Sequence, residues 1–111
     1  MSDPLLDARA RVLADLQACE LADAETVSAL EESVIQRRWW VDQWPEGVEY
    51  VGGLIAQDVQ DAILDRIGRW PLCLRCEDAD GHGLYIRPEL GPNPHWVCEK
   101  SGQVVAPLGR L

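Results

Sequence analysis

The stretch "HWVCEKSGQVVA", residues 95–106, joins two short runs of strand-forming residues through a tight connection. The runs are His95–Cys98 and Gln103–Ala106, rich in valine and tryptophan, which favour extended backbone. The four residues between them end in Gly102, a composition typical of a hairpin turn. This stretch therefore predicts an antiparallel β-hairpin close to the end of the sequence.

The hairpin belongs to a longer β-rich region, residues 70–111. A third strand-like run, "LYIR", covers residues 84–87, and five prolines break any helical periodicity between Pro71 and Pro107. Residues 1–69 have the opposite texture, with apolar residues recurring at steps of three, four and seven, which is the period of a helix. We expect an α+β protein with a helical region (1–69) and a small β region (70–111).

Three helices are predicted in residues 1–69. The first covers residues 4–20 after a cap residue and Pro4, the second begins after Asp23, and the third begins at Pro45 and stops at Gly68. The apolar positions expected to face the core are Leu5, Leu6, Val12, Leu13, Leu16, Cys19, Val27, Leu30, Val34, Val41, Val48, Val51, Ile55, Val59, Ala62, Ile63 and Ile67. Short connections favour an antiparallel three-helix bundle, or a helical hairpin with one further helix.

Two adjacent glycines, Gly52 and Gly53, interrupt the third predicted helix. Each costs a helix about 1 kcal/mol relative to alanine. Either they allow another helix to approach closely, or the helix begins only at Leu54. We favour the close approach.

Charge and the start of the sequence limit the possible settings of this chain. The 111 residues have a formal net charge of −9, with fourteen acidic against six basic residues in positions 1–70. Neither half is basic, so a general affinity for phosphate backbones is not expected. The first residues lack the basic stretch followed by an apolar stretch that a secretory signal has. No apolar run reaches the roughly 20 residues that span a bilayer. These features predict a cytoplasmic protein.

Cysteine and histidine gather in the β region. Cys73 and Cys76 form a C-x2-C pair, Cys98 follows, and the two histidines of the chain, His82 and His95, lie between Cys76 and Cys98. In a reducing compartment such a cluster is more typical of a metal site than of disulfides. The C-x2-C spacing lets two thiolates converge on one tetrahedral Zn²⁺, with Cys98 as the third ligand.

Residues 70–111 resemble a zinc ribbon on the segments "WPLC..C", "H.L" and "WVC...G..VAPLG". They are also similar to the degenerate ribbons that end small uncharacterised bacterial proteins of the high-GC, actinobacterial type. The resemblance implies that Cys98 is the first ligand of a knuckle, with Ser101 where the second thiolate would be. It implies a structural metal and no enzymatic activity.

The fourth ligand is left open between two histidines. His95 forms H-x2-C with Cys98, but residues three apart on a strand point to opposite faces. His82 lies in the loop "DADGHG" and completes a Cys3His set with the spacing C-x2-C-x5-H-x15-C. We favour Cys73, Cys76, His82 and Cys98, with His95 as the alternative to His82; Ser101, water or no fourth ligand are the remaining possibilities.

Other interpretations of the cysteines compete with structural zinc. The hairpin could be metal-free, with cysteines packed as small hydrophobic residues. A redox dithiol is disfavoured because Glu77, Asp78 and Asp80 follow Cys76 and would raise the pKa of a thiol. Three cysteines with a bound water would make an open zinc site, the one route to a small metalloenzyme or enzyme subunit. Hydrolase, protease, phosphate-loop and dinucleotide motifs are absent from the sequence.

The segment "QRRWWVDQW", residues 36–44, combines two arginines with three tryptophans. Such residues can anchor a protein partner or stack on bases. The plain alternative is a helix end that buries some rings while its arginines pair with acids. The candidate partner-binding residues are Arg37, Arg38, Trp39, Trp40 and Trp44.

The aspartates Asp58, Asp61 and Asp65 follow one face of the third predicted helix. Helical di-metal carboxylate sites pair a glutamate with a histidine three residues later. Residues 1–70 contain no histidine, so a solvated acidic face is expected.

These features together predict a non-catalytic, acidic, zinc-ribbon-containing protein that binds another protein as an adaptor, accessory subunit or regulator. The first alternative is a transcription- or nucleic-acid-associated ribbon. Its local basic patch would comprise Arg37, Arg38, Arg75 and Arg87. The second alternative is the open-site metalloenzyme subunit.

Overall fold

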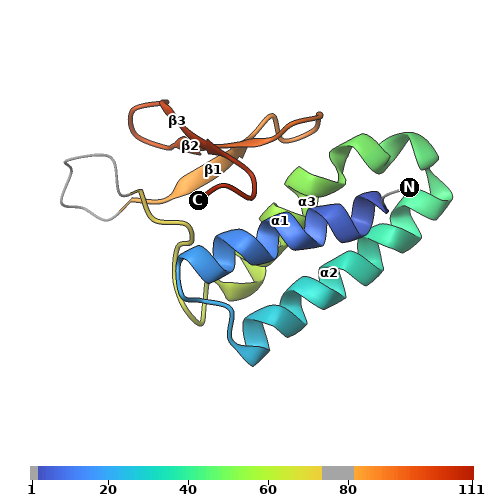
Figure 1. Cartoon of the computed structure of the whole chain (residues 1–111), viewed down its shortest axis with the longest axis horizontal. Helices are drawn as coiled ribbons and strands as arrows, with labels where there is room; N and C mark the ends of the chain where they lie inside the picture. The colour runs from blue at the N-terminus through green and yellow to red at the C-terminus, as the bar shows by residue number, and fades with distance from the viewer. Residues whose placement is uncertain (1–2, 74–81) are drawn as a thin grey trace.

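The computed structural model describes residues 3–73 and 82–111. Three α-helices come first and a three-stranded sheet follows (Figure 1), which confirms the predicted α+β class. The elements are α1 (Pro4–Ala18), α2 (Ala24–Gln43), the 3-10 helix η1 (Pro45–Tyr50), α3 (Val51–Ile63), β1 (Leu84–Arg87), β2 (His95–Cys98) and β3 (Val104–Pro107). Among the described residues, no helix has the length and apolar character needed to cross a bilayer.

Side-chain caps set the starts of the first two helices. The Asp3 carboxylate accepts a 2.9 Å hydrogen bond from the backbone N–H of Leu5, and Pro4 occupies the first turn of α1. At α2 the predicted cap is confirmed, since Asp23 accepts a 2.8 Å bond from the N–H of Thr26. Helix α1 ends at Ala18, two residues before the predicted end, because Glu20 turns the chain with a φ of 58°.

The third predicted helix is divided in two. Residues Pro45–Tyr50 form η1, and α3 begins at Val51, so both glycines lie inside the α-helix. A Cβ on Gly53 would lie 3.1 Å from the carbonyl oxygen of Glu89 and 3.2 Å from Cγ2 of Ile86. The prediction of close approach at this glycine pair is therefore confirmed for Gly53, but β1 and the loop after it approach, rather than another helix.

The sheet has the strand order β1-β2-β3, and both pairings are antiparallel. Leu84 lies opposite Cys98 and Ile86 opposite Trp96, while a shift of register follows Trp96 on the β3 side. The predicted hairpin of β2 and β3 is confirmed, and β3 starts one residue later than expected. The N–H of Cys98 donates to the carbonyl of Gln103 (2.9 Å) and closes the turn.

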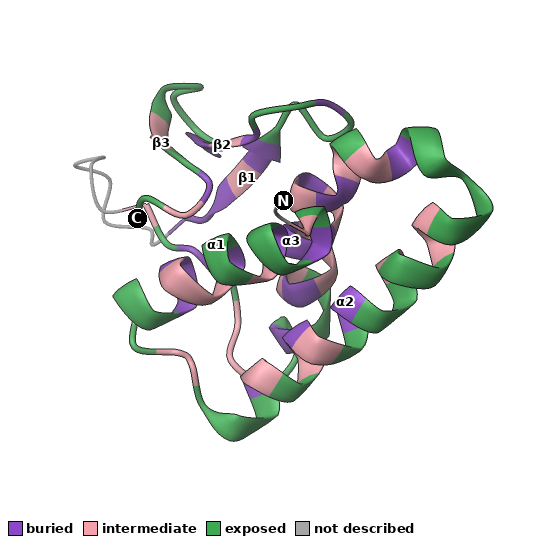
Figure 2. Ribbon diagram, turned by 45° about the vertical axis from the view of Figure 1, so that its right-hand side comes forward, coloured by how far each residue is buried: buried purple, intermediate pink, exposed green. Residues whose placement is uncertain are grey.

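One hydrophobic cluster joins the helices to the sheet. Its buried members come from all three helices and from the sheet (Figure 2), and Trp96 of β2 is fully buried among them. Most of the apolar stripe predicted for α3 is buried, and Ala62 is an exception. Leu6 of α1 was expected near the core and is instead 53% exposed, since α1 directs the flanking residues Leu5 and Ala8 inward.

A buried carboxylate connects α1 to the β region. Asp15 is fully buried, and its oxygens accept hydrogen bonds from the indole N–H of Trp96 (2.7 Å) and the backbone N–H groups of Gly109 (2.7 Å) and Leu111 (2.9 Å). A buried polar group is tolerated when its hydrogen-bonding capacity is satisfied in this way. Asp15 thus ties both the central strand and the segment after β3 to the first helix.

Candidate metal centre

The backbone on either side of residues 74–81 brings Cys73 beside His82. The N–H of Cys73 donates to the carbonyl of His82 (3.0 Å), and Leu72 forms an isolated antiparallel bridge with Gly83. This pairing continues directly into β1, where Leu84 lies opposite Cys98. Sheet pairing therefore brings together three side chains that are distant in sequence.

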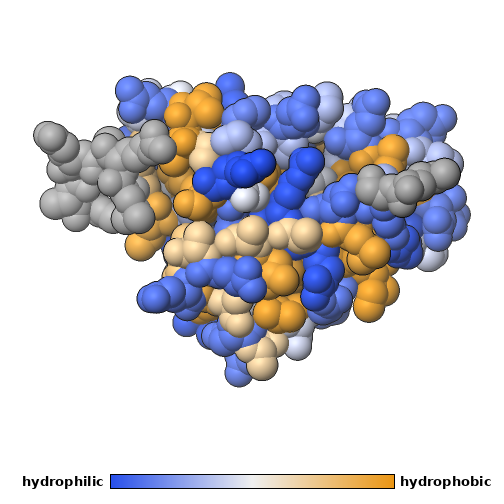
Figure 3. All heavy atoms as spheres, in the orientation of Figure 1, coloured by the Kyte–Doolittle hydropathy of each residue, from blue (hydrophilic) through white to orange (hydrophobic). Residues whose placement is uncertain are grey.

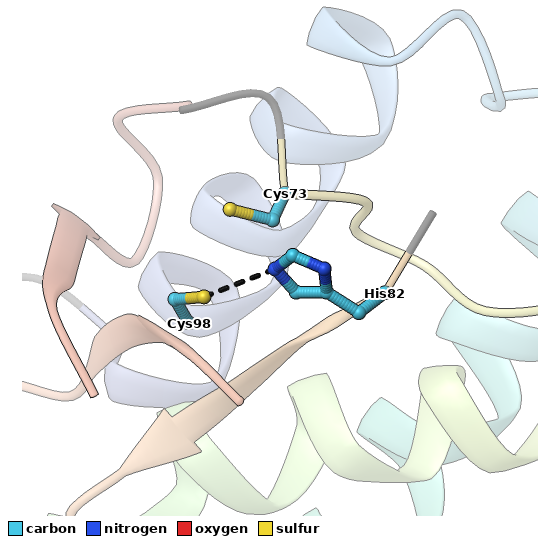
Figure 4. Close-up of side chains that lie close together, drawn as sticks. All are labelled: Cys73, His82 and Cys98. Atoms are coloured by element: carbon cyan, nitrogen blue, oxygen red, sulfur yellow. Dashed lines mark hydrogen bonds between the residues drawn. The ribbon is translucent and has the colours of Figure 1, made fainter. Parts of the chain in front are cut away.

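Cys73, His82 and Cys98 form a compact group. Their ligand atoms all lie within 4.8 Å of one another, and Nε2 of His82 is 3.1 Å from Sγ of Cys98. Figure 4 shows the two sulfur atoms and the imidazole directed toward one another. His82 and Cys98 are buried, at 5% and 1% exposed, and Cys73 is half-buried.

The turn after β2 surrounds the Cys98 sulfur with donors. The N–H of Ser101 lies 3.4 Å from Sγ, and Gly102, with a φ of 75°, closes the turn by donating to the carbonyl of Cys98 (2.9 Å). The Ser101 hydroxyl also accepts the N–H of Gln103 at 3.2 Å. Hydrogen bonds from the Ser101 side chain, then from its backbone N–H, lower the pKa of the Cys98 thiol to about 6.

The other ring nitrogen of His82 is a buried atom without a hydrogen-bond partner among the described residues. The backbone next to His82, by contrast, is held by hydrogen bonds. The Glu99 carboxylate accepts the N–H of Gly83 at 3.1 Å and forms an ion pair with Arg69, so it joins the residue after His82 and Arg69 to the turn after β2. Sequence analysis did not assign this function to Glu99, although its position directly after Cys98 placed it beside the predicted site.

Two other predicted ligands have different outcomes. His95 is at the opposite end of β2 from Cys98, pairs with Arg87 across the sheet, and is not part of the Cys73–His82–Cys98 group. Cys76 lies outside the described residues. Cys19 is separate from the group: it packs against the core, and burial raises the pKa of its thiol.

The arginines of the tryptophan-rich segment contact acids. Arg37 binds Asp58 through two hydrogen bonds of 2.8 and 2.7 Å, and Arg38 binds Asp3 at 2.8 Å. Asp58 also accepts the hydroxyl of Ser33 (2.8 Å), so it is a half-buried ion-pair residue rather than part of a solvated face. Asp61 and Asp65, by contrast, are exposed as expected.

The tryptophans of the same segment have different exposures. Trp39 is 66% exposed and Trp44 is 44% exposed. Trp40 is half-buried and packs edge-to-face on Trp44 with 5.2 Å between ring centroids. A Cβ on Gly47 would lie only 2.6 Å from the Trp40 ring, so η1 passes directly against it. Trp39 is thus the ring that is most open to a partner.

Two thiols and an imidazole are the donor types that Zn²⁺ prefers, and their burial leaves little room for bulk water. With a fourth protein ligand, such a site is closed and serves structure; with three ligands it retains one open position. The group formed by Cys73, His82 and Cys98 could therefore bind a metal ion.

Comparison with known proteins shows that a family model matches the chain. No curated protein and no solved structure matches the chain. The model described as "Domain of unknown function (DUF8819)" matches residues 1–108 and so includes both the helices and the sheet. The chain belongs to this family of unknown function, whose model matches the helical region and the candidate metal centre alike.

Proposed function

We propose that this protein is a non-catalytic, zinc-stabilised protein that binds another protein. The observation that carries the proposal is the convergence of Cys73, His82 and Cys98, whose ligand atoms lie within 4.8 Å of one another. The fourth ligand is Cys76, three residues after Cys73 in a C-x2-C pair. This set corresponds to the degenerate zinc ribbon that the sequence resembles.

The geometry of the described ligands fits a tetrahedral ion. Zn–S bonds of about 2.3 Å and Zn–N bonds of about 2.0 Å separate a sulfur from a nitrogen by about 3.5 Å at the tetrahedral angle. The separation of 3.1 Å between Nε2 of His82 and Sγ of Cys98 needs only a small expansion to admit the ion. Zinc would also compensate the burial of thiolates that otherwise face one another.

A structural function suits the size of the sheet. The three strands have only four residues each, and small sheets depend on packing or on a metal for stability. Zinc would join the segment that ends at Cys73 to His82 and to the turn after β2. It would supply folding free energy and leave no open coordination position for chemistry.

The proposed partner surface lies on the first two helices. Ile35 and Trp39 are one turn apart on α2 and are 69% and 66% exposed, and Leu6 of α1 is 53% exposed. The pairs Arg38–Asp3 and Arg9–Glu31 bracket Leu6 and Ile35 along the two helices, which places the apolar residues on one face. We name Leu6, Ile35 and Trp39 the helical patch. Figure 3 shows exposed apolar residues, in orange, among polar ones on the face of the molecule that carries α1.

The charges around the helical patch favour a protein over a nucleic acid. Arg37 and Arg38, which would have to contact phosphates, are each bound to a carboxylate. An exposed tryptophan beside aliphatic residues and a polar rim is the composition of a protein-binding hot spot. A chain with net charge −9 would also repel a phosphate backbone at long range.

The zinc site is tested by metal analysis of purified variants. We expect about one zinc per chain in the wild type, and less than a fifth of that in His82→Ala and Cys98→Ser. His95→Ala and Ser101→Ala are the matched controls and should retain full zinc content. Zinc-free wild-type protein would refute the metal site, and loss of zinc in His95→Ala instead of His82→Ala would show that His95 is the histidine ligand.

The partner surface is tested by purification of the tagged protein from its host, followed by mass spectrometry. We expect a protein that co-purifies with the wild type and is lost with Trp39→Ser. The control is Leu90→Ser, which removes a residue that is 62% exposed on the loop after β1. A partner retained by Trp39→Ser would show that the helical patch is not the interface.

A further inference from the structure

A second candidate site lies at the opposite end of β2 from the metal centre. An open cleft of about 630 Å³ lies between α1, the loop that precedes β2, and the segment that follows β3. Its lining includes three basic side chains, Arg11 of α1, His95 of β2 and Arg110 after β3. Figure 1 shows the segment after β3 running from the sheet toward α1. Three residues of this segment, Leu108, Gly109 and Arg110, line the cleft.

The arginines of this cleft differ from the others in the described residues. Arg9, Arg37, Arg38, Arg66 and Arg69 each form an ion pair with a carboxylate. Arg87 lies over the ring of Tyr85 at 5.4 Å. Within residues 3–73 and 82–111, only Arg11 and Arg110 have neither kind of contact, and both line the same cleft.

The absence of acids from this lining is unusual for so acidic a chain. None of the ten residues that line the cleft is an aspartate or glutamate. Asp7 and Glu49 line an adjoining hollow that shares Arg11 with the cleft, and the buried carboxylate of Asp15 lies behind Gly109 with its oxygens bonded to N–H groups. Two guanidinium groups and an imidazole therefore face one solvent-filled space with no carboxylate in its wall, and such a space attracts anions.

The structure fixes the backbone that carries these cations. Gly109 has a φ of 93°, and a Cβ there would lie 3.0 Å from the Cβ and Cγ atoms of Arg11. Its N–H donates to the buried Asp15 carboxylate, and the N–H of Arg110 donates to the carbonyl of Pro107 (3.0 Å). The segment after β3 is thus anchored against the stem of Arg11, so the backbones that carry Arg11 and Arg110 are fixed next to each other before any ligand arrives.

We propose that this cleft binds the phosphate group of a small phosphorylated molecule through Arg11 and Arg110, with His95 as a third donor. One guanidinium group can donate two parallel hydrogen bonds to phosphate oxygens. Two guanidinium groups in one cleft therefore match a phosphate dianion better than a carboxylate, which a single arginine can bind. The cleft volume lies within the usual range for small-molecule sites. This site is separate from the zinc ligands and from the helical patch.

The test is a titration followed by amide chemical shifts in a ¹H–¹⁵N spectrum at pH 7.5 and constant ionic strength. The probes are inorganic phosphate, phenyl phosphate and malonate. We expect saturable shifts at Arg11, His95 and Gly109 with both phosphates, and binding at least fivefold weaker in Arg11→Gln and Arg110→Gln. The matched control, Arg87→Gln, removes an arginine outside this cleft and should bind as the wild type does.

The probes also distinguish the sources of the phosphate group. Equal affinities for the two phosphates would indicate recognition of the group alone, and tighter binding of phenyl phosphate would indicate that the apolar wall contacts the rest of an ester; both support the site. Shifts that do not saturate, an equal loss in Arg87→Gln, or malonate binding as tight as phosphate would overturn the proposal.

Discussion

The indole N–H of Trp96 donates a 2.7 Å hydrogen bond to the carboxylate of Asp15, and both side chains are fully buried. The two residues are 81 positions apart, so this bond joins the first helix to the central strand. Asp15 also accepts the N–H groups of Gly109 and Leu111. One carboxylate therefore organises the helix, the sheet and the wall of the proposed phosphate cleft.

Replacement of Asp15 by alanine should be strongly destabilising. It leaves three N–H donors without an acceptor and creates a small cavity, at a cost of about 3 kcal/mol or more in the free energy of unfolding. Asp15→Asn preserves the shape but can accept through only one atom, so its loss should be smaller. Urea denaturation followed by tryptophan fluorescence measures both; an Asp15→Ala variant as stable as the wild type would contradict this account.

The glycine pair of α3 offers a prediction with a built-in control. Gly53→Ala forces a Cβ to within 3.1 Å of the Glu89 carbonyl and should destabilise the protein by about 1–2 kcal/mol despite the better helix propensity. Gly52→Ala meets its nearest atoms at an ordinary 3.5 Å and should gain up to about 1 kcal/mol. Thermal unfolding of the two variants measures these opposite effects. Equal shifts of the two melting temperatures would contradict the predicted difference between Gly52 and Gly53.

Local signals in the sequence predicted much of the fold. The strand runs, the glycine-closed turn after Cys98 and the cap at Asp23 depend on neighbours within a few residues, and the structure contains all three. The clustering and spacing of the cysteines and histidines in the sequence also point to His82, Cys73 and Cys98. The structure then brings Cys73, His82 and Cys98 together.

The remaining features depend on contacts between distant segments. Asp15 reads in sequence as one more acidic residue of a helix, because its donors lie after position 95. Similarly, Gly53 indicated a close approach without indicating that β1 would make it. The split between η1 and α3 accompanies the contact between Gly47 and the Trp40 ring, which a helical periodicity cannot reveal.

Asp23 should make stability dependent on pH in the acid range. The Thr26 backbone N–H, followed by the Thr26 side chain and Arg66, holds the pKa of the Asp23 carboxyl below its ordinary value of 3.8. A lowered folded pKa means that this stabilisation is present above the ordinary pKa and is lost as the pH falls through the lowered one. Asp23→Ala should therefore lower the urea midpoint at pH 7 and make little difference at pH 2.

The control for the pH measurement is Asp61→Ala, which removes an exposed aspartate of α3 that caps no helix. Its urea midpoint should stay close to the wild-type value at both pH values. An Asp23→Ala variant whose destabilisation is as large at pH 2 as at pH 7 would show that the carboxylate charge is not the stabilising feature of this cap.

Removal of zinc should loosen the segments that its ligands join before it affects the helices. The N–H of Cys73 bonds to His82, and the N–H groups of Ser101 and Gly102 bond to Cys98, so each depends on a backbone that carries a proposed ligand. Local opening needs only those bonds to break, whereas exchange in the middle of α2 requires the packed core to open. With a chelator, hydrogen exchange at the three amides should accelerate at least tenfold, while Leu30 and Val34 change less. The variant His82→Ala should reproduce these rates without a chelator and should not respond further when a chelator is added. If a chelator leaves the exchange rates of zinc-loaded wild-type protein unchanged, zinc does not stabilise this region.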